Sequence, residues 1–249
     1  FPFARVEGAQ IPKGAIGTHC AVTYKGSIAF LGGGQGETPA VYAAGNGKAS
    51  KISTREIDLL LSEYTEEQLA TSVMEVVEDL GSSLLWIRLP DRTLVFDAQV
   101  SQALGGSAWF VMSSSSSPTL SLYRGVDAIW CYDQWQVGDS ESENIGILDD
   151  TMSTHFGQNV YWEFSTQFVF NESRGMVFHS LELISLPGRV AFEEDAYIST
   201  SYTLDGQTWS QQRPLYVGKR GDRTQRLMWR RQGNMRNFRA QRFSGDSRA

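Results

Sequence analysis

Short runs of β-type residues, each followed by a turn, recur through the first 150 residues at the spacing of one small antiparallel sheet. Three stretches carry this pattern, at 21–54, 73–112 and 119–149, and each divides into four strand-like runs. Lys25-Gly26 and Asn46-Gly47 are hairpin signals, because tight hairpin turns favour Gly and Asn. Four short strands in about 35 residues is the size of one propeller blade. The spacing therefore predicts consecutive β-propeller blades.

One segment between the first two repeats is predicted to be helical, over about residues 54–72. Ser53 and Glu56 have the spacing of a capping box, and apolar residues follow them at helical intervals. Thr65 and Gln68 offer a second cap for a short following helix. We expect this segment to cover a blade edge that would otherwise pair with another strand.

Beyond about residue 160 the β-type runs become longer, which is typical of an antiparallel sandwich. The runs lie at 160–171, 176–186, 196–204, 213–218, 224–232 and 236–243. Leu227 and Trp229 alternate with polar or outward-facing neighbours, so one face of that strand can be buried. Gly233-Asn234 is the predicted turn into the last run. We therefore predict an all-β chain, with propeller blades and a short helical insertion over 1–150 and a β-sandwich-like region over 151–249.

Two glycine-rich stretches and a serine run are interpreted as connections. The stretches at 32–36 and 45–50 lack the spacing of a phosphate-binding loop, since Tyr42 and Ala49 stand where Gly and Ser or Thr are needed. Both are predicted to be hairpin turns. The run 113–117, closed by a proline, is predicted to be a flexible loop inside the propeller region.

Charge is distributed very unevenly along the chain. Residues 1–210 hold 11 Lys/Arg against 26 Asp/Glu, a net charge of −15, whereas residues 211–249 hold 11 against 2, a net charge of +9. A basic segment on an acidic body suits three partners: nucleic acid, an acidic neighbouring subunit, or the acidic body itself.

The composition offers few groups for metal or redox chemistry. Cys20 and Cys131 match no metal or redox spacing and are expected to be free thiols, and the three histidines are scattered. We expect no cofactor and no metal. No uninterrupted apolar run approaches the roughly 18 residues of a membrane span. The first ten residues lack an initiating Met and the pattern of a signal peptide, which suggests a chain that begins inside a longer protein.

The stretch SYTLDGQTW, at 201–209, resembles the Asp-box turn of sialidases. The match is imperfect, because Leu204 stands at the position of the acid, five residues before Trp209. We predict a tight hairpin, with Asp205 and Gly206 in the turn and Trp209 as its anchor. A glycosidase also needs two carboxylates about 5–10 Å apart, and the adjacent acidic pairs in this sequence diverge on strands and helices. A catalytic pair of carboxylates that lie far apart in the sequence remains an alternative.

Several stretches in order resemble the packaged-DNA stabilisation proteins of short-tailed bacteriophages, which form a tail hub or nozzle. The likeness covers nearly the whole chain and corresponds to a C-terminal portion of those proteins. The residues that carry it are KISTREIDLLLSEYT (51–65), RTLVFDA (92–98), YDQWQVGDSESENIGILDD (132–150), FHSLELISLPG (178–188), SYTLDGQTWSQQRPLYVGKRG (201–221) and MWRRQGNMRNFRAQRF (228–243). Gln232 departs from the leucine that relatives more often have.

The resemblance implies a structural virion protein of the phage tail, assembled in the host cytoplasm, which closes the portal channel and stabilises packaged DNA. It implies a homo-oligomer, a hexamer for the full-length protein, that contacts a head-completion adaptor, a tail needle or plug, tailspikes and the packaged DNA, but no membrane. We expect five arginines to serve subunit or adaptor contacts: Arg226, Arg230, Arg231, Arg236 and Arg239. The alternatives are a sialidase-like carbohydrate-active propeller enzyme and a non-catalytic binding module.

Overall fold

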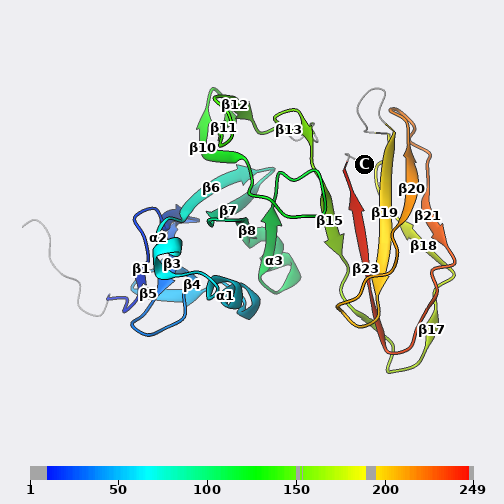
Figure 1. Cartoon of the computed structure of the whole chain (residues 1–249). Helices are drawn as coiled ribbons and strands as arrows, with labels where there is room; N and C mark the ends of the chain where they lie inside the picture. Colours follow the sequence, from blue (N-terminus) through cyan, green and yellow to red (C-terminus); the bar gives the residue numbers. More distant parts are fainter. Residues whose placement is uncertain (1–9, 150–151, 153, 189–194, 247–249) are drawn as a thin grey trace, which may run out of the picture. The chain divides into compact units, whose positions relative to one another are not determined.

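The computed structural model describes residues 10–149, 152, 154–188 and 195–246, and the chain divides into two compact units (Figure 1). Unit 1 comprises residues 1–113 and 120–148, and unit 2 comprises residues 114–119 and 149–249. The serine run is therefore not a loop internal to the blade region, because residues 114–119 belong to unit 2. The main-chain N–H of Tyr161 donates to the carbonyl of Ser115 at 2.8 Å, which ties this segment to unit 2.

The first sheet of unit 1 is an antiparallel meander. Its strands are β1 (Gly14–Ala15), β2 (Ala21–Tyr24), β3 (Ser27–Gly33), β4 (Ala40–Gly45) and β5 (Lys48–Lys51). Strands β1 and β2 both pair with β3, at opposite ends of it, and β4 and β5 follow in order. Lys25, Gly26, Asn46 and Gly47 all have positive φ, so the two predicted hairpins are confirmed. Sharing β3 between two short strands gives the sheet the width of four strands.

Part of the glycine-rich stretch lies in this sheet rather than in a turn. Gly32 is in β3, opposite Ala15 of β1, so the prediction of a simple turn over 32–36 is wrong at its start. A Cβ atom at Gly32 would lie 1.9 Å from the main-chain oxygen of Gly14, whereas one at Gly33 would meet nothing closer than 3.6 Å. The absence of a side chain at Gly32 is what allows β1 to approach.

Gly32→Ala is therefore expected to destabilise the chain by about 1–3 kcal/mol, because the methyl group must displace the β1 backbone. Gly33→Ala is the matched control and is expected to change stability by well under 1 kcal/mol. Urea denaturation of both variants measures the difference. Equal losses for the two substitutions would contradict the close-approach explanation.

The helical insertion consists of α1 (Arg55–Leu61) and α2 (Glu66–Ala70). The predicted capping box at Thr65 and Gln68 is confirmed, but the first cap is Thr54 rather than Ser53. Ser53 is buried, and its hydroxyl accepts from the N–H of Val41 and donates to Asp58, so it is engaged with the sheet instead. Each helix contributes one fully buried leucine to the core of unit 1.

The second sheet has the order β6-β7-β8-β9 and is antiparallel throughout. Its strands are β6 (Val73–Asp79), β7 (Ser82–Arg88), β8 (Thr93–Asp97) and β9 (Ala108–Met112). Between the last two lies a helix that the sequence interpretation missed, α3 (Ala98–Leu104). Asp97 caps its N-terminus, and Gly105 ends it at φ 67°. One face of this sheet joins the first sheet and the helices in a shared apolar core.

The third sheet has three strands, β10 (Gly125–Cys131), β11 (Gln134–Asp139) and β12 (Ile145–Ile147). A strand predicted within 119–125 is absent from the described residues, because that segment is held by side chains and not by a ladder. Tyr123 is buried with its ring edge-on to Trp86 at 5.4 Å. Arg124 forms a buried ion pair with Asp139 of β11.

Unit 2 contains a small hairpin and two facing layers of strands (Figure 1). The hairpin is β13 (Thr154–His155) and β14 (Gln158–Asn159). The larger layer contains β15 (Trp162–Ser165), β16 (Val169–Phe170), β23 (Phe238–Gly245), β19 (Ala196–Thr203) and β20 (Arg213–Gly218). The smaller contains β17 (Met176–Val177), β18 (Ser180–Leu183), β21 (Leu227–Arg230) and β22 (Asn234–Met235). All pairs are antiparallel.

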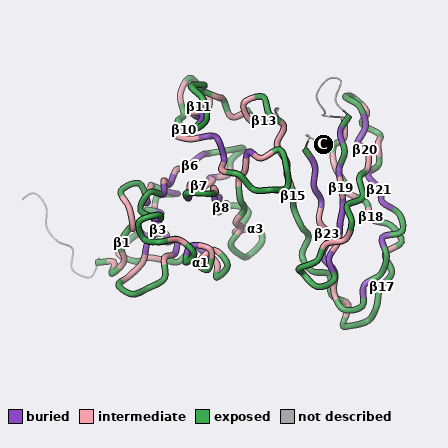
Figure 2. The backbone as a smooth tube through the Cα atoms, viewed as in Figure 1, coloured by how far each residue is buried: buried purple, intermediate pink, exposed green. Residues whose placement is uncertain are grey.

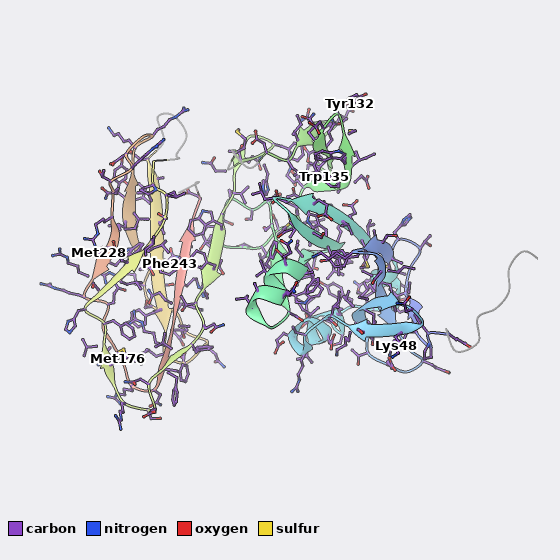
Figure 3. All side chains as sticks on the ribbon, turned by 180° about the vertical axis from the view of Figure 1, so that it is seen from behind. Lys48, Tyr132, Trp135, Met176, Met228 and Phe243 are labelled. Atoms are coloured by element: carbon purple, nitrogen blue, oxygen red, sulfur yellow. The ribbon has the colours of Figure 1, made fainter. Side chains whose placement is uncertain are left out.

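The core of unit 2 lies between these layers. Leu227 and Trp229 of β21 are buried, as their alternation predicts, and pack in one cluster with Ile198, Val217 and Phe243. Figure 2 shows the buried segments of β19 and β23, and Met228 of β21 and Phe243 of β23 mark the two layers in Figure 3. The all-β prediction is confirmed.

The predicted long strands of the smaller layer are interrupted by a bulge. Arg231 and Gly233 both have positive φ, and the N–H of Phe178 donates to the Gly233 carbonyl at 2.8 Å. The run 176–186 is consequently split into β17 and β18. Asn234 pairs with Val177 in a ladder, so Gly233-Asn234 is not the turn into the last strand. The chain bends at 236–237 instead.

Candidate functional site

The turn after β19 is organised by the carboxylate of Asp205. Its Oδ1 accepts the main-chain N–H groups of Gln207 and Thr208 at 2.8 and 2.7 Å, and the hydroxyl of Thr203 at 2.9 Å. Its Oδ2 accepts the hydroxyl of Thr208 at 2.7 Å. Gly206 has φ 79°, which favours glycine. These donors hold the pKa of Asp205 well below its usual value, the Thr208 hydroxyl first among them.

Trp209 closes this turn onto the sheet. Its backbone bridges Thr203, and the guanidinium carbon of Arg242 lies 3.6 Å from the centre of its ring. Arg242 in turn approaches Glu163 at 3.5 Å. The tryptophan is therefore anchored by a cation–π contact to β23. The described contacts use the Asp205 carboxylate within its own turn, so the stretch that resembles an Asp box has a folding role.

Asp205→Ala is expected to lower the melting temperature of the chain, because it leaves four donors of the turn without their acceptor. A carboxyl with a depressed pKa in the folded state stabilises the protein above its ordinary pKa, 3.8 for Asp, and this stabilisation is lost as the pH falls below it. Asp205→Asn keeps one acceptor oxygen and is expected to lose less stability and to remove this part of the acid dependence. Melting curves between pH 7 and pH 3 test both statements.

The structure separates the five arginines that were predicted to form contacts. The guanidinium of Arg226 makes a two-fold interaction with Glu182 of the paired strand, at 2.8 and 2.7 Å. Arg230, Arg231 and Arg236 are exposed and form no ion pair with a described residue. Arg230, Arg231 and Arg236 are thus available on the surface, whereas Arg226 is paired with Glu182 within unit 2.

Arg239 lies in the interior of the sandwich, so its prediction as a contact residue is wrong. Its side chain is 2 % exposed, and its Nη1 donates to the carbonyl of Gln232, while Nε and Nη2 donate to Gln241 at 3.2 and 2.9 Å. Its guanidinium also stacks over the rings of Phe178 and Tyr202 at 4.5 and 3.9 Å. Burial lowers the pKa of Arg239. The side chain of Arg239 thus connects β23 to the smaller layer, through Gln232 and Phe178.

Residues that the sequence interpretation did not single out complete this polar interior. Gln241 donates to the hydroxyl of Thr200 at 2.6 Å, and Gln232 is buried beside Arg239. Arg213 donates to the carbonyls of Arg230 and Arg231 at 2.9 and 3.1 Å, which links β20 to the end of β21. The parity of β23 was an available signal, since Arg239 and Gln241 share a face with buried Phe243.

Within the described part of the chain, no group of three or more His, Cys, Asp or Glu side chains is arranged to hold a metal ion. Cys20 and Cys131 are both free thiols, the first of them buried. Among the residues that the structure describes, no helix has the length and apolar character that crossing a membrane requires.

A chain with blade-like antiparallel sheets followed by a two-layer sandwich has the organisation of an all-β protein of the propeller-and-sandwich class. Residues 1–153 match the family described as Bacteriophage P22 Gp10, beta-propeller, and residues 161–249 match the one described as Bacteriophage P22 Gp10, beta-sandwich. The chain belongs to the P22 Gp10 family. The family and the propeller-then-sandwich order predicted from the sequence are confirmed.

A curated relative agrees with this assignment. The chain is 30 % identical over 230 residues to the tail hub protein gp10 of Salmonella phage P22. The alignment covers 92 % of this chain and 47 % of that protein. The chain thus spans about half the length of the curated relative that it matches.

Proposed function

We propose that this chain is part of a tail-hub subunit of a short-tailed bacteriophage and that its role is structural. The observation that carries the proposal is the match of both parts of the chain, in order, to the propeller and sandwich of P22 Gp10. The identity of 30 % to a protein named a tail hub supports the same role. A sialidase-like activity lacks such support, because the stretch that suggested it is a turn whose Asp205 is engaged by its own neighbours.

In the virion, the full-length protein forms a homo-oligomeric ring, a hexamer, that closes the portal channel and retains packaged DNA. It meets a head-completion adaptor, a tail needle or plug, and tailspikes, and it assembles in the host cytoplasm. The charge division supports a ring, since residues 1–210 carry −15 and residues 211–249 carry +9. The basic strands of one subunit then attract the acidic surface of its neighbour.

Arg230 and Arg231 are the arginines best placed for this contact, because both are exposed and their carbonyls are fixed by Arg213. The double variant Arg230→Glu/Arg231→Glu keeps those main-chain bonds and reverses the surface charge. We expect the concentration for half-assembly of the full-length protein to rise by at least about tenfold, since like charges across an interface cost more than 1.4 kcal/mol. Light scattering and native mass measurement, with and without the adaptor, give this concentration.

Lys25→Glu/Lys48→Glu is the matched control, because it makes the same change in net charge at two exposed hairpin positions of unit 1. The control is expected to assemble like the wild type. Assembly of the arginine variant at the wild-type concentration would contradict the role of Arg230 and Arg231. A wild-type full-length protein that stays monomeric with its adaptor would contradict the ring itself.

A further inference from the structure

A cavity of about 220 Å³ lies within unit 1, on the face of the second sheet that is turned away from the apolar core. Its polar lining comes from Glu75, Trp86, Arg88, Thr93 and Asp127. In the ladder, Glu75 is opposite Trp86 and Arg88 is opposite Thr93, so these four side chains share one face. Asp127 belongs to β10 of the third sheet and is exposed. The cavity therefore lies at the junction of two blades.

Glu75 and Arg88 are the two charged residues of the second sheet at this junction, and they differ in how many of their polar atoms have a partner. Burial raises the pKa of the Glu75 carboxyl, and the nearby main-chain N–H groups of Ala128 and Asp127 act against that rise. Arg88 donates through Nη1 to the carbonyls of Tyr123 and Gly125, each at 3.1 Å. Its Nε and Nη2 have no acceptor among the described residues. The Nε and Nη2 groups of Arg88, which lines the cavity, are therefore available as donors to a ligand.

Two neutral polar groups in the wall are also without partners. Trp86 and Thr93 are 4 % and 2 % exposed, and within the described part of the chain neither the indole Nε1 nor the hydroxyl forms a hydrogen bond. Buried polar groups in native proteins are nearly always paired with protein, water or a ligand. Neither atom is exposed to solvent, so the donors that a ligand can reach are those of Arg88, and Asp127 at the edge of the cavity supplies an acceptor.

We propose that this cavity binds a neutral, polyhydroxylated molecule of the size of one hexose unit. Glu75 and Asp127 disfavour an anion, and Arg88 disfavours a cation, because an unpaired charge loses solvation on entering a cavity. A hydroxyl group both donates and accepts, so a sugar ring satisfies Arg88 and Asp127 at once. Valines 73 and 126 form apolar walls for its C–H groups. The volume lies below the roughly 300–1,000 Å³ typical of sites for drug-sized ligands, which favours a single ring.

The site does not depend on ring assembly. All of its residues come from unit 1, and the sheets that carry them are present in the single chain. Binding a saccharide would be a function separate from the proposed role in closing the portal channel. Its test is therefore independent of the oligomeric state.

The indole N–H of Trp86 provides a direct readout. In a proton–nitrogen spectrum each of the seven tryptophans gives its own indole signal, and Trp86→Phe identifies the one in the cavity. The full chain is titrated separately with D-glucose, D-galactose, D-mannose and L-rhamnose. We expect at least one of them to shift the Trp86 signal in a saturable manner, with a dissociation constant of about a millimolar, as is usual for a ligand with so few atoms.

Two variants test the assignment of contacts. Asp127→Asn keeps the positive φ that Asn tolerates and is expected to weaken binding by about tenfold, since a charged hydrogen bond is lost. Thr93→Val removes a buried hydroxyl that has no partner among the described residues and is not exposed to the cavity, so the melting temperature should stay the same or rise while binding stays as in the wild type. The matched control is Asp133→Asn, at another exposed Asp with positive φ that lies outside the cavity. It is expected to bind like the wild type.

Three results would overturn the proposal. The first is a Trp86 signal that none of the four sugars shifts at 100-fold the expected dissociation constant, which means that the cavity holds water only. The second is equal binding by the wild type and Asp127→Asn. The third is a shift produced by glycine betaine and by none of the sugars, which assigns the cavity to a zwitterion instead.

Discussion

Replacing Arg239 with alanine is expected to lower the free energy of unfolding by about 3–5 kcal/mol, because two buried acceptors each lose a donor, at about 1–3 kcal/mol per group, and a large buried side chain is removed. The guanidinium satisfies the carbonyl of Gln232 and the side chain of Gln241, both of them buried residues, and its loss leaves these acceptors without that donor. The rings of Phe178 and Tyr202 also lose the cation stacked on them. Urea denaturation at neutral pH measures the loss.

Arg236→Ala is the matched control, since it removes an exposed arginine three positions away and is expected to change stability by less than about 0.5 kcal/mol. Arg239→Lys keeps the charge but not the planar fork, so an intermediate loss is expected. A loss for Arg239→Ala no larger than that of the control would show that the buried network contributes nothing. The arginine then belongs with the surface residues, as the sequence interpretation had it.

The prediction that Arg239 is a surface residue was wrong because composition does not show which face of a strand a side chain occupies. A run of arginines near the end of a chain indicates a basic surface, and for Arg230, Arg231 and Arg236 that indication holds. Side-chain parity overrides it in β23, where Arg239 shares the inward face with Phe243. Nothing local shows that this face receives the carbonyl of Gln232, because that partner comes from the bulge at the end of β21.

The strands of the blades and the sandwich were predictable, because turn residues and alternation are local signals. The bounds of β20 agree with the predicted run at 213–218. The helix α3 was missed since its seven residues stand between two strands, although Asp97 and Gly105 are the expected caps. Gly32 looked like a turn residue because a sequence does not show that the β1 backbone passes over it. The cavity beside Arg88 joins residues about 50 positions apart and leaves no pattern in the sequence.

Trp229→Ala is expected to lower the free energy of unfolding by about 3–5 kcal/mol, the range for truncating a buried aromatic residue. The side chain is 3 % exposed and packs in the cluster between the layers, with its ring 5.8 Å from that of Phe243. Its indole N–H also donates to the carbonyl of Arg213 at 2.9 Å, so it joins β21 to β20 across the edge of the sandwich. Truncation therefore removes both apolar contact and a link between the layers.

Two further variants separate these contributions. Trp229→Phe keeps an aromatic ring and loses the hydrogen bond, so about 1–2 kcal/mol is expected from the bond and the reduced volume. Met228→Ala, at the neighbouring half-buried position whose side chain lies on the opposite face of β21, is the control and should cost less than about 1 kcal/mol. Urea denaturation followed by circular dichroism ranks the three variants. If Met228→Ala costs as much as Trp229→Ala, the alternation does not place Trp229 in the core, and the two layers are held together by other residues.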